Sequence, residues 1–263
     1  MKISFTTMAT PELNIYSQIS VAKEYGFDGL DFRVVRGGKG EISPEIGLTE
    51  AKEIRHSLKS IELPGMLCYN KKIQDGHDNM VSSILDCLHL AQLLEIPTIR
   101  IFTGKLENDL NKEYLISVLQ DVLEQDKSDV IIAMQNHIES GITLHQGLDV
   151  CQEMKTDRVG IIISPDHAVL SGENMEEILP ELAPYTTQLY VADLDEKHKL
   201  VPIGEGIIDF TQILNTLCVY GFRGYTTLKW EKCWHNELCD YPMAFRSFLQ
   251  WVYETGMFAK RIK

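Results

Sequence analysis

The sequence predicts an α/β fold: a single-domain (β/α)8 TIM barrel over residues 1–263. Short β-branched runs recur about every 30 residues, and each is followed by a segment with helical periodicity. Eight such alternations are present, and no stretch rich in Pro, Gly or Ser interrupts them. A hydrophobic content of 44% in 263 residues is enough for one large core.

The predicted strands are short runs rich in β-branched and aromatic residues. Strands that alternate with helices run parallel, because each crossover helix returns the chain to the same edge of the sheet. In chain order the strands cover residues 2–6, 29–34, 63–69, 98–102, 130–135, 159–164, 188–192 and 225–229.

The predicted helices carry apolar residues three and four positions apart, as one buried face requires. Asp209 and Asp240 precede the last two helices, and we expect both to act as N-caps that accept from free backbone amides. The helices cover residues 15–25, 48–60, 81–94, 111–125, 144–154, 175–182, 210–220 and 242–255.

Composition excludes several kinds of partner. Acidic residues outnumber basic ones by 38 to 25, a formal net charge of -13, so nucleic acid is not expected. The six cysteines contain no CxxC pair and indicate free thiols in a reducing compartment. No apolar run approaches the ~20 residues of a membrane span. We expect a cytoplasmic protein without a membrane partner, and the sequence leaves open whether it is a homo-oligomer.

The polar residues at the strand ends carry the functional prediction, because active sites of such barrels lie there. Side chains alternate along a strand, so parity assigns every second one to the barrel interior. At the ends of the last four predicted strands the inward residues are Gln135, Ser164, Tyr190 and Lys229.

Four segments carry a resemblance to a known family. Residues 26–33 read GFDGLDFR and residues 189–193 read LYVAD. Residues 202–210 read PIGEGIIDF, a Gly-Glu-Gly turn before an aspartate-capped helix, and residues 221–231 read GFRGYTTLKWE. In these segments the chain resembles the xylose-isomerase-like sugar phosphate isomerase/epimerase barrels. The resemblance implies a TIM barrel whose ligand is a small sugar or sugar phosphate.

The resemblance also implies a metal site, which this chain is predicted to have lost. The family holds a divalent cation by a glutamate, an aspartate, a histidine and a glutamate at the ends of strands five to eight. Two unit charges 4 Å apart interact by about 4 kcal/mol at an effective dielectric of ~20, so a lysine among the ligands repels the cation. We therefore predict no metal and no cofactor. In family order, the four positions hold Gln135, Ser164, Tyr190 and Lys229.

A displaced metal site stays open as an alternative. Shifting the alignment by two positions keeps the inward parity of each strand and recruits other donors. The ligands of such a site would be Asp166, His167, His137 and Glu231.

Lys229 has two interpretations. Buried charges persist mostly by pairing, so the first is a structural lysine beside an acid. The second is a chemical role, in which Lys229 polarises or captures a carbonyl or moves a proton. The candidate acids for the first interpretation are Glu205, Asp193 and Glu231.

The predicted catalytic residues are Lys229, His167 and Glu205. His167 follows Ser164 by three positions, which resembles a family histidine that contacts the substrate sugar, and Glu205 lies in the family's Gly-Glu-Gly turn. The predicted substrate-binding residues are Arg33, Gln135, His137, Ser164, Tyr190 and Glu231.

Other charged residues near the strand ends have structural interpretations. Arg33 carries a planar fork suited to a phosphate or carboxylate, and its alternative is an ion pair with Asp31 or Glu41. Arg100 is expected to pair with Asp31 inside the barrel, and Asp166 is expected at the surface.

Two functions are predicted. The family reaction moves a proton on the carbon beside a carbonyl with the help of a metal and two carboxylates, and it cannot run as inherited without them. The first prediction is a sugar phosphate isomerase/epimerase-like protein that acts on, or binds, a small sugar or keto-acid without metal. The alternative is a pseudoenzyme, a non-catalytic barrel that binds a sugar-like ligand or has a regulatory role.

Overall fold

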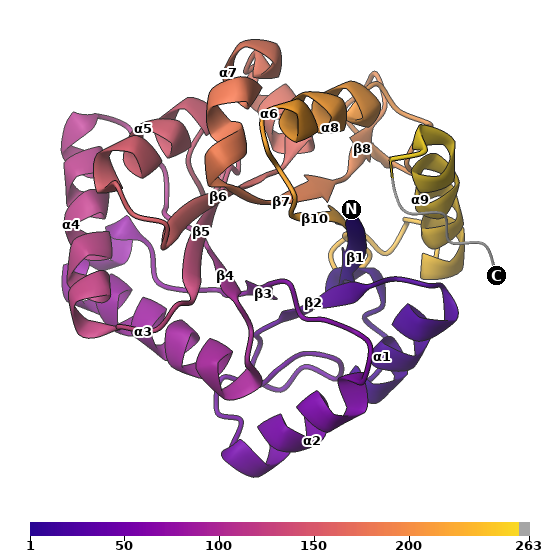
Figure 1. The fold of residues 1–263 in the computed structure, drawn as a ribbon, viewed down its shortest axis with the longest axis horizontal. Helices are drawn as coiled ribbons and strands as arrows, with labels where there is room; N and C mark the ends of the chain where they lie inside the picture. The colour runs from indigo at the N-terminus through magenta and orange to yellow at the C-terminus, as the bar shows by residue number, and fades with distance from the viewer. Residues whose placement is uncertain (258–263) are drawn as a thin grey trace.

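The computed structural model describes residues 1–257 and forms a closed barrel of parallel strands (Figure 1). The strands pair in the order β1-β10-β7-β6-β5-β4-β3-β2, so the first and last strands close the ring. The predicted (β/α)8 barrel is confirmed. The barrel strands are β1 (Lys2–Thr6), β2 (Gly29–Arg33), β3 (Met66–Leu67), β4 (Thr98–Ile101), β5 (Ile131–Gln135), β6 (Val159–Ile163), β7 (Thr186–Val191) and β10 (Tyr225–Leu228).

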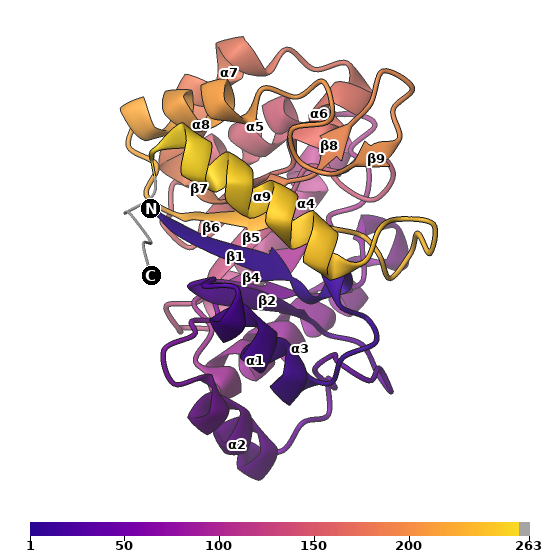
Figure 2. The same ribbon diagram turned by 90° about the vertical axis from the view of Figure 1, so that its right-hand side faces the viewer.

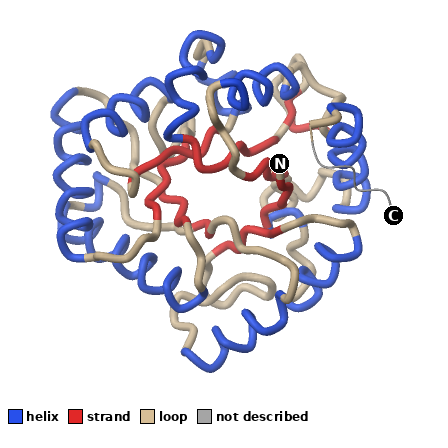
Figure 3. Tube along the Cα trace, viewed as in Figure 1, coloured by secondary structure: helices blue, strands red, loops and turns tan. Residues whose placement is uncertain are grey.

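A layer of helices surrounds the strands, which form the red ring inside the blue coils of Figure 3. In the side view of Figure 2, helix α9 lies over β1, and Phe245 packs on Phe5 with ring centroids 4.7 Å apart. Within residues 1–257 no helix is long and apolar enough to cross a bilayer. The helices are α1 (Ile15–Glu24), α2 (Leu48–Leu58), α3 (His77–Leu94), α4 (Asp109–Gln125), α5 (Leu144–Met154), α6 (Pro165–Ser171), α7 (Met175–Leu182), α8 (Phe210–Val219) and α9 (Tyr241–Thr255).

The strands divide the buried side chains between two separate layers. Ile132 and Met134 of β5 belong to the large core under the helices. Ala133, between them, forms a small separate cluster with Ile162 and Tyr190 inside the barrel. Alternation along a strand produces this division, so the parity assigned from sequence places these residues correctly.

The largest differences from the prediction lie in three places. Strand β3 spans only Met66–Leu67, and it begins late because Pro64 lacks the amide that an earlier start of the ladder would need. Helix α6 follows β6 directly where a loop was expected. A short antiparallel hairpin of β8 (Asp193–Leu194) and β9 (Leu200–Val201) follows β7.

Only one of the two predicted aspartate caps is formed. Asp209 Oδ1 accepts from the Gln212 amide at 2.9 Å at the start of α8, as predicted. The side chain of Asp240 makes no capping hydrogen bond to α9, so that prediction is wrong. Its carboxylate lies instead 3.1 Å from Lys232 Nζ.

Asp193 explains the Gly-Glu-Gly turn that carries part of the family resemblance. Its buried carboxylate accepts from the amides of Gly204 and Gly206 at 3.0 Å each, and also from those of Leu194 and Ile208. Gly204 has a φ of +90°, which favours glycine. A Cβ on Gly206 would lie 2.2 Å from Asp193 Oδ1, so the second glycine allows the close approach.

Candidate functional site

Lys229 directly follows β10 and points into the carboxyl end of the barrel, where its side chain is 1% exposed. Its Nζ donates to Asp166 Oδ2 at 2.7 Å and to His167 Nε2 at 3.1 Å. Glu231 Oε1 lies 3.5 Å from the same nitrogen. We call these four residues the Lys229 cluster. Two acids and one imidazole therefore surround the ammonium.

The sharp connection between β6 and α6 brings two members of the cluster into place. Strand β6 ends at Ile163 and α6 begins at Pro165, a residue suited to a first helical turn because it lacks the amide that would go unpaired there. Asp166 and His167 lie in that turn and are buried. The prediction that Asp166 is a surface acid is wrong, because the short helix directs its carboxylate toward Lys229.

Lys229 stays protonated in this cluster. Burial alone would lower its pKa, but the carboxylates of Asp166 and Glu231 outweigh burial and raise the pKa above its ordinary value. Attack on a carbonyl needs a neutral amine. The cluster therefore favours a fixed positive charge over a covalent role for Lys229.

His137 and His167 contact each other in the mouth, with ring centroids 3.9 Å apart. Burial and the charges of Lys229 and Arg100 lower the pKa of His167 to about 2. Burial, His167 and Lys229 are the main causes that lower the pKa of His137 to about 3. Because an ammonium only donates, neutral His167 accepts through Nε2 and carries its proton on Nδ1. That buried Nδ1 has no hydrogen-bond partner among the described residues.

Gln135 and Ser164 bond to each other across neighbouring strands. Gln135 Nε2 donates to Ser164 Oγ at 2.9 Å. Asn136 fixes the backbone beside them, since its side chain donates to Ser164 O at 2.9 Å and accepts from Ser164 N at 2.7 Å. Both predicted binding residues thus lie at the mouth, each engaged by the other.

Tyr190 lies deeper in the barrel and bonds to Asp31. Tyr190 OH donates to Asp31 Oδ2 at 3.1 Å, and Gln188 Nε2 donates to the same oxygen at 2.8 Å. Burial raises the pKa of Asp31 to about 7, although both hydrogen bonds and the charge of Arg100 counteract it in part.

The predicted ion pair between Arg100 and Asp31 is wrong. Within residues 1–257, Arg100 makes no salt bridge, because its side chain extends toward the mouth and lies over aromatic rings instead. Its guanidinium carbon is 3.9 Å from the ring centroid of Phe102 and 5.1 Å from that of Tyr69.

Arg33 forms an ion pair with Glu41, as its structural interpretation predicted. Its Nη1 lies 2.7 Å from Glu41 Oε1, and its Nε donates to Tyr69 OH at 3.1 Å. The guanidinium carbon is also 4.8 Å from the centroid of the exposed Trp234 ring. The fork of Arg33 is therefore engaged by neighbouring side chains, and a ligand would have to displace them.

Glu205 lies apart from the Lys229 cluster. It is exposed in the turn that Asp193 holds, and it makes no salt bridge with Lys229 in the described chain. The predicted partnership of Lys229 with Glu205 or Asp193 is therefore wrong, because the carboxylate of Asp193 is engaged by backbone amides. Of the candidate acids only Glu231 lies beside the ammonium.

A cavity of about 270 Å³ opens beside the cluster. Lys229 and Glu231 line it, whereas Asp166 and His167 do not, so the cavity faces the Glu231 side of the ammonium. This volume suits a small ligand. Its remaining lining residues are Met8, Leu67, Tyr69, Arg100, Phe102, Gln135, His137, Glu139, Ser140 and Trp234.

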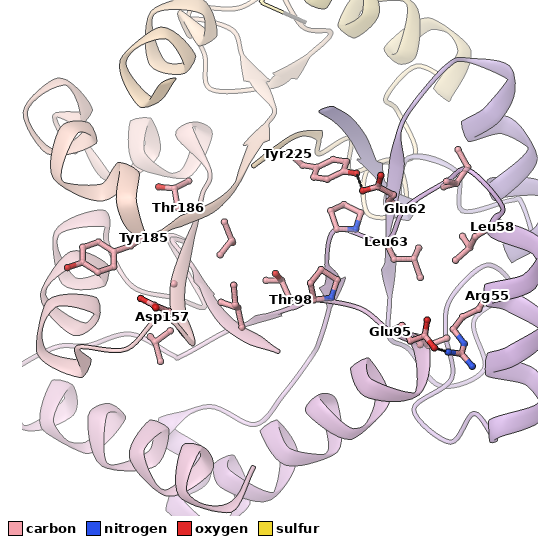
Figure 4. Close-up of a pocket in the computed structure, with 18 of the residues that line it drawn as sticks. Arg55, Leu58, Glu62, Leu63, Glu95, Thr98, Asp157, Tyr185, Thr186 and Tyr225 are labelled. Carbon is pink, nitrogen blue, oxygen red and sulfur yellow. Dashed lines mark hydrogen bonds and ion pairs between the residues drawn. The ribbon is translucent and has the colours of Figure 1, made fainter. Parts of the chain in front are cut away.

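A larger cavity of about 850 Å³ lies at the opposite end of the barrel (Figure 4). Its lining residues Thr98, Thr186 and Tyr225 are the first residues of their strands, and Tyr225 OH donates to Glu62 at its edge. In TIM barrels the chemistry lies at the carboxyl ends of the strands, whereas the amino-terminal face serves stability. We therefore place the candidate site in the smaller cavity beside Lys229.

A family model described as "Xylose isomerase-like TIM barrel" matches residues 19–250, most of the chain. The chain belongs to this family. A curated relative, inosose isomerase of Bacillus velezensis, is 19% identical over 248 residues, which cover 87% of this chain and 88% of the relative.

Solved structures show the same barrel. An IOLI protein with a bound zinc atom superposes with a TM-score of 0.79 at 16% identity, covering 99% of this chain and 100% of that one. D-psicose 3-epimerase of Clostridium cellulolyticum H10, solved with D-tagatose, gives a TM-score of 0.78 at 14% identity, covering 97% and 98%. At these identities the likeness shows the fold alone.

In this xylose isomerase-like chain the four residues predicted as ligands of a displaced metal site do not converge on one point. Within residues 1–257, no three His, Cys, Asp or Glu side chains converge as they would around a metal ion. Asp166, His167 and Glu231 surround the Lys229 ammonium instead, and His137 contacts His167.

Proposed function

We propose that this barrel binds a small sugar or keto-acid in the Lys229 cavity without a divalent cation. The observation that carries the proposal is the buried ammonium, which lies 2.7 Å from Asp166 and borders the cavity at the carboxyl end of the barrel. The names of the relatives, inosose isomerase and D-psicose 3-epimerase, support a sugar-like ligand class.

The residues present do not fit a divalent cation. At the family's ligand positions, Gln135 and Ser164 are neutral and bonded to each other. The hydroxyl of Tyr190 donates to Asp31, and Lys229 is positive. A cation 4 Å from the ammonium would be repelled by about 4 kcal/mol at an effective dielectric of ~20. In this proposal Lys229 supplies the positive charge of the mouth.

Proton transfer beside a carbonyl needs a base and a group that stabilises the oxygen as it becomes negative. Glu231 and Lys229 line the same cavity, 3.5 Å apart. In the catalytic form of the proposal, Glu231 removes a proton from the carbon beside the carbonyl. The C–H electron pair forms a carbon–carbon double bond, the carbonyl electrons move onto oxygen, and Lys229 stabilises that oxygen. Return of the proton to the opposite face of the same carbon gives an epimer. Return to the former carbonyl carbon gives an isomer, provided that the hydroxyl proton of the first carbon moves to the former carbonyl oxygen.

A non-catalytic binding barrel is the second candidate. It is favoured by the state of the two mouth histidines, whose pKa values of about 2 and 3 leave them unable to exchange protons efficiently at neutral pH. The ammonium is also held by Asp166 and His167. Such a site would hold a ligand without turning it over.

One pair of experiments in EDTA tests the proposal and separates the two candidates. Thermal unfolding with hydroxypyruvate or a panel of ketoses reports binding, and deuterium uptake from D2O at the carbon beside the carbonyl, followed by NMR, reports catalysis. The catalytic form predicts stabilisation together with uptake, and the uptake is lost in Glu231→Gln and Lys229→Met. The matched control is Glu124→Gln, an exposed carboxylate on α4, which keeps both signals.

Stabilisation without deuterium uptake would identify the non-catalytic candidate. Binding or uptake that appears only after Mn²⁺, Zn²⁺ or Mg²⁺ is added would contradict the metal-independent proposal. Absence of stabilisation by every compound would contradict the ligand class.

A further inference from the structure

Arg100 is a buried cation that forms no salt bridge with any acid of the described chain. It is 2% exposed, and its Nε and Nη1 are buried without a hydrogen-bond partner among residues 1–257. Asp31, the acid that parity places inside the same barrel, accepts from Gln188 and Tyr190 instead. The guanidinium lies against the aromatic rings of Phe102 and Tyr69, and Asp31 attracts its charge without forming a salt bridge within residues 1–257.

The other cations at the mouth differ from Arg100 in this respect. Lys229 has Asp166 and Glu231 beside it, and Arg33 has Glu41. A buried charge without a salt-bridge partner is destabilising, and ring contacts and the attraction of Asp31 return only part of that cost. Retaining Arg100 in this state therefore points to a negative group that arrives from outside the chain.

The position of Arg100 specifies where that negative group binds. Arg100 and Lys229 line the same cavity of about 270 Å³. A guanidinium whose face lies on an aromatic ring keeps its N–H edge for a planar acceptor, and a carboxylate matches that edge with two parallel hydrogen bonds.

We propose that Arg100 binds the carboxylate of the ligand, so that the substrate class is a small keto- or hydroxy-acid rather than a neutral sugar. This inference rests on the proposed function, because it names the ligand class of the same cavity. A carboxylate fits better than a phosphate, since Glu139 and Glu231 also line the cavity and repel a dianion more than a monoanion. With the carboxylate on Arg100, the carbonyl or hydroxyl oxygen of the acid faces Lys229.

Pairs of compounds that differ by one carboxylate test the inference. Dissociation constants are measured by thermal shift and calorimetry for hydroxypyruvate against dihydroxyacetone, and for glycerate against glycerol. Each acid should bind about 10-fold to 100-fold more tightly than its neutral counterpart, the range expected for a charge-assisted pair. Arg100→Met should remove this preference, and Arg100→Lys should retain part of it. Arg36→Met, a change at an exposed arginine, should leave it intact.

The stability of the unliganded variants provides a second readout. Replacing an unbalanced buried cation with an apolar side chain should leave the melting temperature unchanged or raise it. A lower melting temperature in Arg100→Met, with the acid preference retained, would assign Arg100 a structural role and overturn the inference.

The outcomes separate this inference from the function on which it rests. Equal affinity for acids and neutral compounds would overturn the carboxylate site and leave the proposed cavity intact. Tighter binding of dihydroxyacetone phosphate than of either acid, lost in Arg100→Met, would replace carboxylate by phosphate and overturn the inference as stated. Binding of neither acids nor neutral compounds would overturn both proposals.

Discussion

At the scale of single residues, the mouth of the barrel is organised by charges that depend on one another. The Lys229 ammonium and the Asp166 carboxylate are 1% and 4% exposed, so each has lost most of its hydration and relies on the other. His167 accepts from the same ammonium, which fixes its ring and its tautomer. The position of Lys229 therefore determines the state of its neighbours.

Lys229→Met should lower the free energy of unfolding by about 3–5 kcal/mol, because it leaves the buried Asp166 carboxylate unpaired. The double variant Asp166→Asn/Lys229→Met should lose clearly less than the sum of the two single losses. Urea denaturation of the four proteins measures both effects. Strict additivity of the two single changes would show that these side chains are not coupled.

Asp31 should make the stability of the barrel depend on pH. The unfolded chain ionises this carboxyl near 3.8 and the folded chain near 7, so between these values the folded state binds more protons. The free energy of unfolding therefore falls as pH rises through this interval, by up to about 4 kcal/mol. Asp31→Asn should remove this component, since its amide oxygen can accept the same two hydrogen bonds without ionising. Urea denaturation at pH 5 and pH 8 measures it.

If the stability difference between Asp31→Asn and the parent protein were the same at both pH values, the raised pKa of Asp31 would be refuted. The raised pKa would also be refuted if Asp31→Asn lowered the free energy of unfolding at both pH 5 and pH 8 while that of the parent protein did not fall between these two pH values.

At the scale of elements, the regular parts of the fold follow from sequence and the short ones do not. Strand parity places Ala133, Ile162 and Tyr190 inside the barrel because a strand alternates with a fixed period. Helix α6 is too short to show a hydrophobic period, and it sets the direction of Asp166 and His167. The available signal is Pro165 immediately after a buried strand, which is typical of a first helical turn.

The two aspartates before α8 and α9 form a natural pair for testing capping. Asp209→Ala should lower the free energy of unfolding by about 1 kcal/mol, because the Gln212 amide loses its acceptor. Asp240→Ala should cost less than that, since it removes only an exposed contact with Lys232. Equal losses in thermal or urea unfolding would contradict this difference between the two helix starts.

At the scale of the whole molecule, sequence predicts the barrel and the end at which the site lies, but not the pairing inside it. Periodicity identifies the strands, and the closed ring brings their carboxyl ends together. The geometry of the loops decides which acid meets Lys229, and the sequence does not show it. Glu205 is exposed, whereas Asp166 is buried and accepts from the Lys229 ammonium. The lack of a salt-bridge partner for Arg100 within residues 1–257 is likewise visible only in the structure.

The metal content of the purified protein decides whether a fixed ammonium has replaced a cation in this barrel. After dialysis against Mn²⁺, Zn²⁺ or Mg²⁺ and removal of the free ion, mass spectrometry of the elements should find clearly less than one equivalent bound. Lys229 holds the acids that a cation would need, so substitution of Asp166 or His167 should not change that result. One equivalent of metal, lost in Asp166→Asn or His167→Gln, would contradict it.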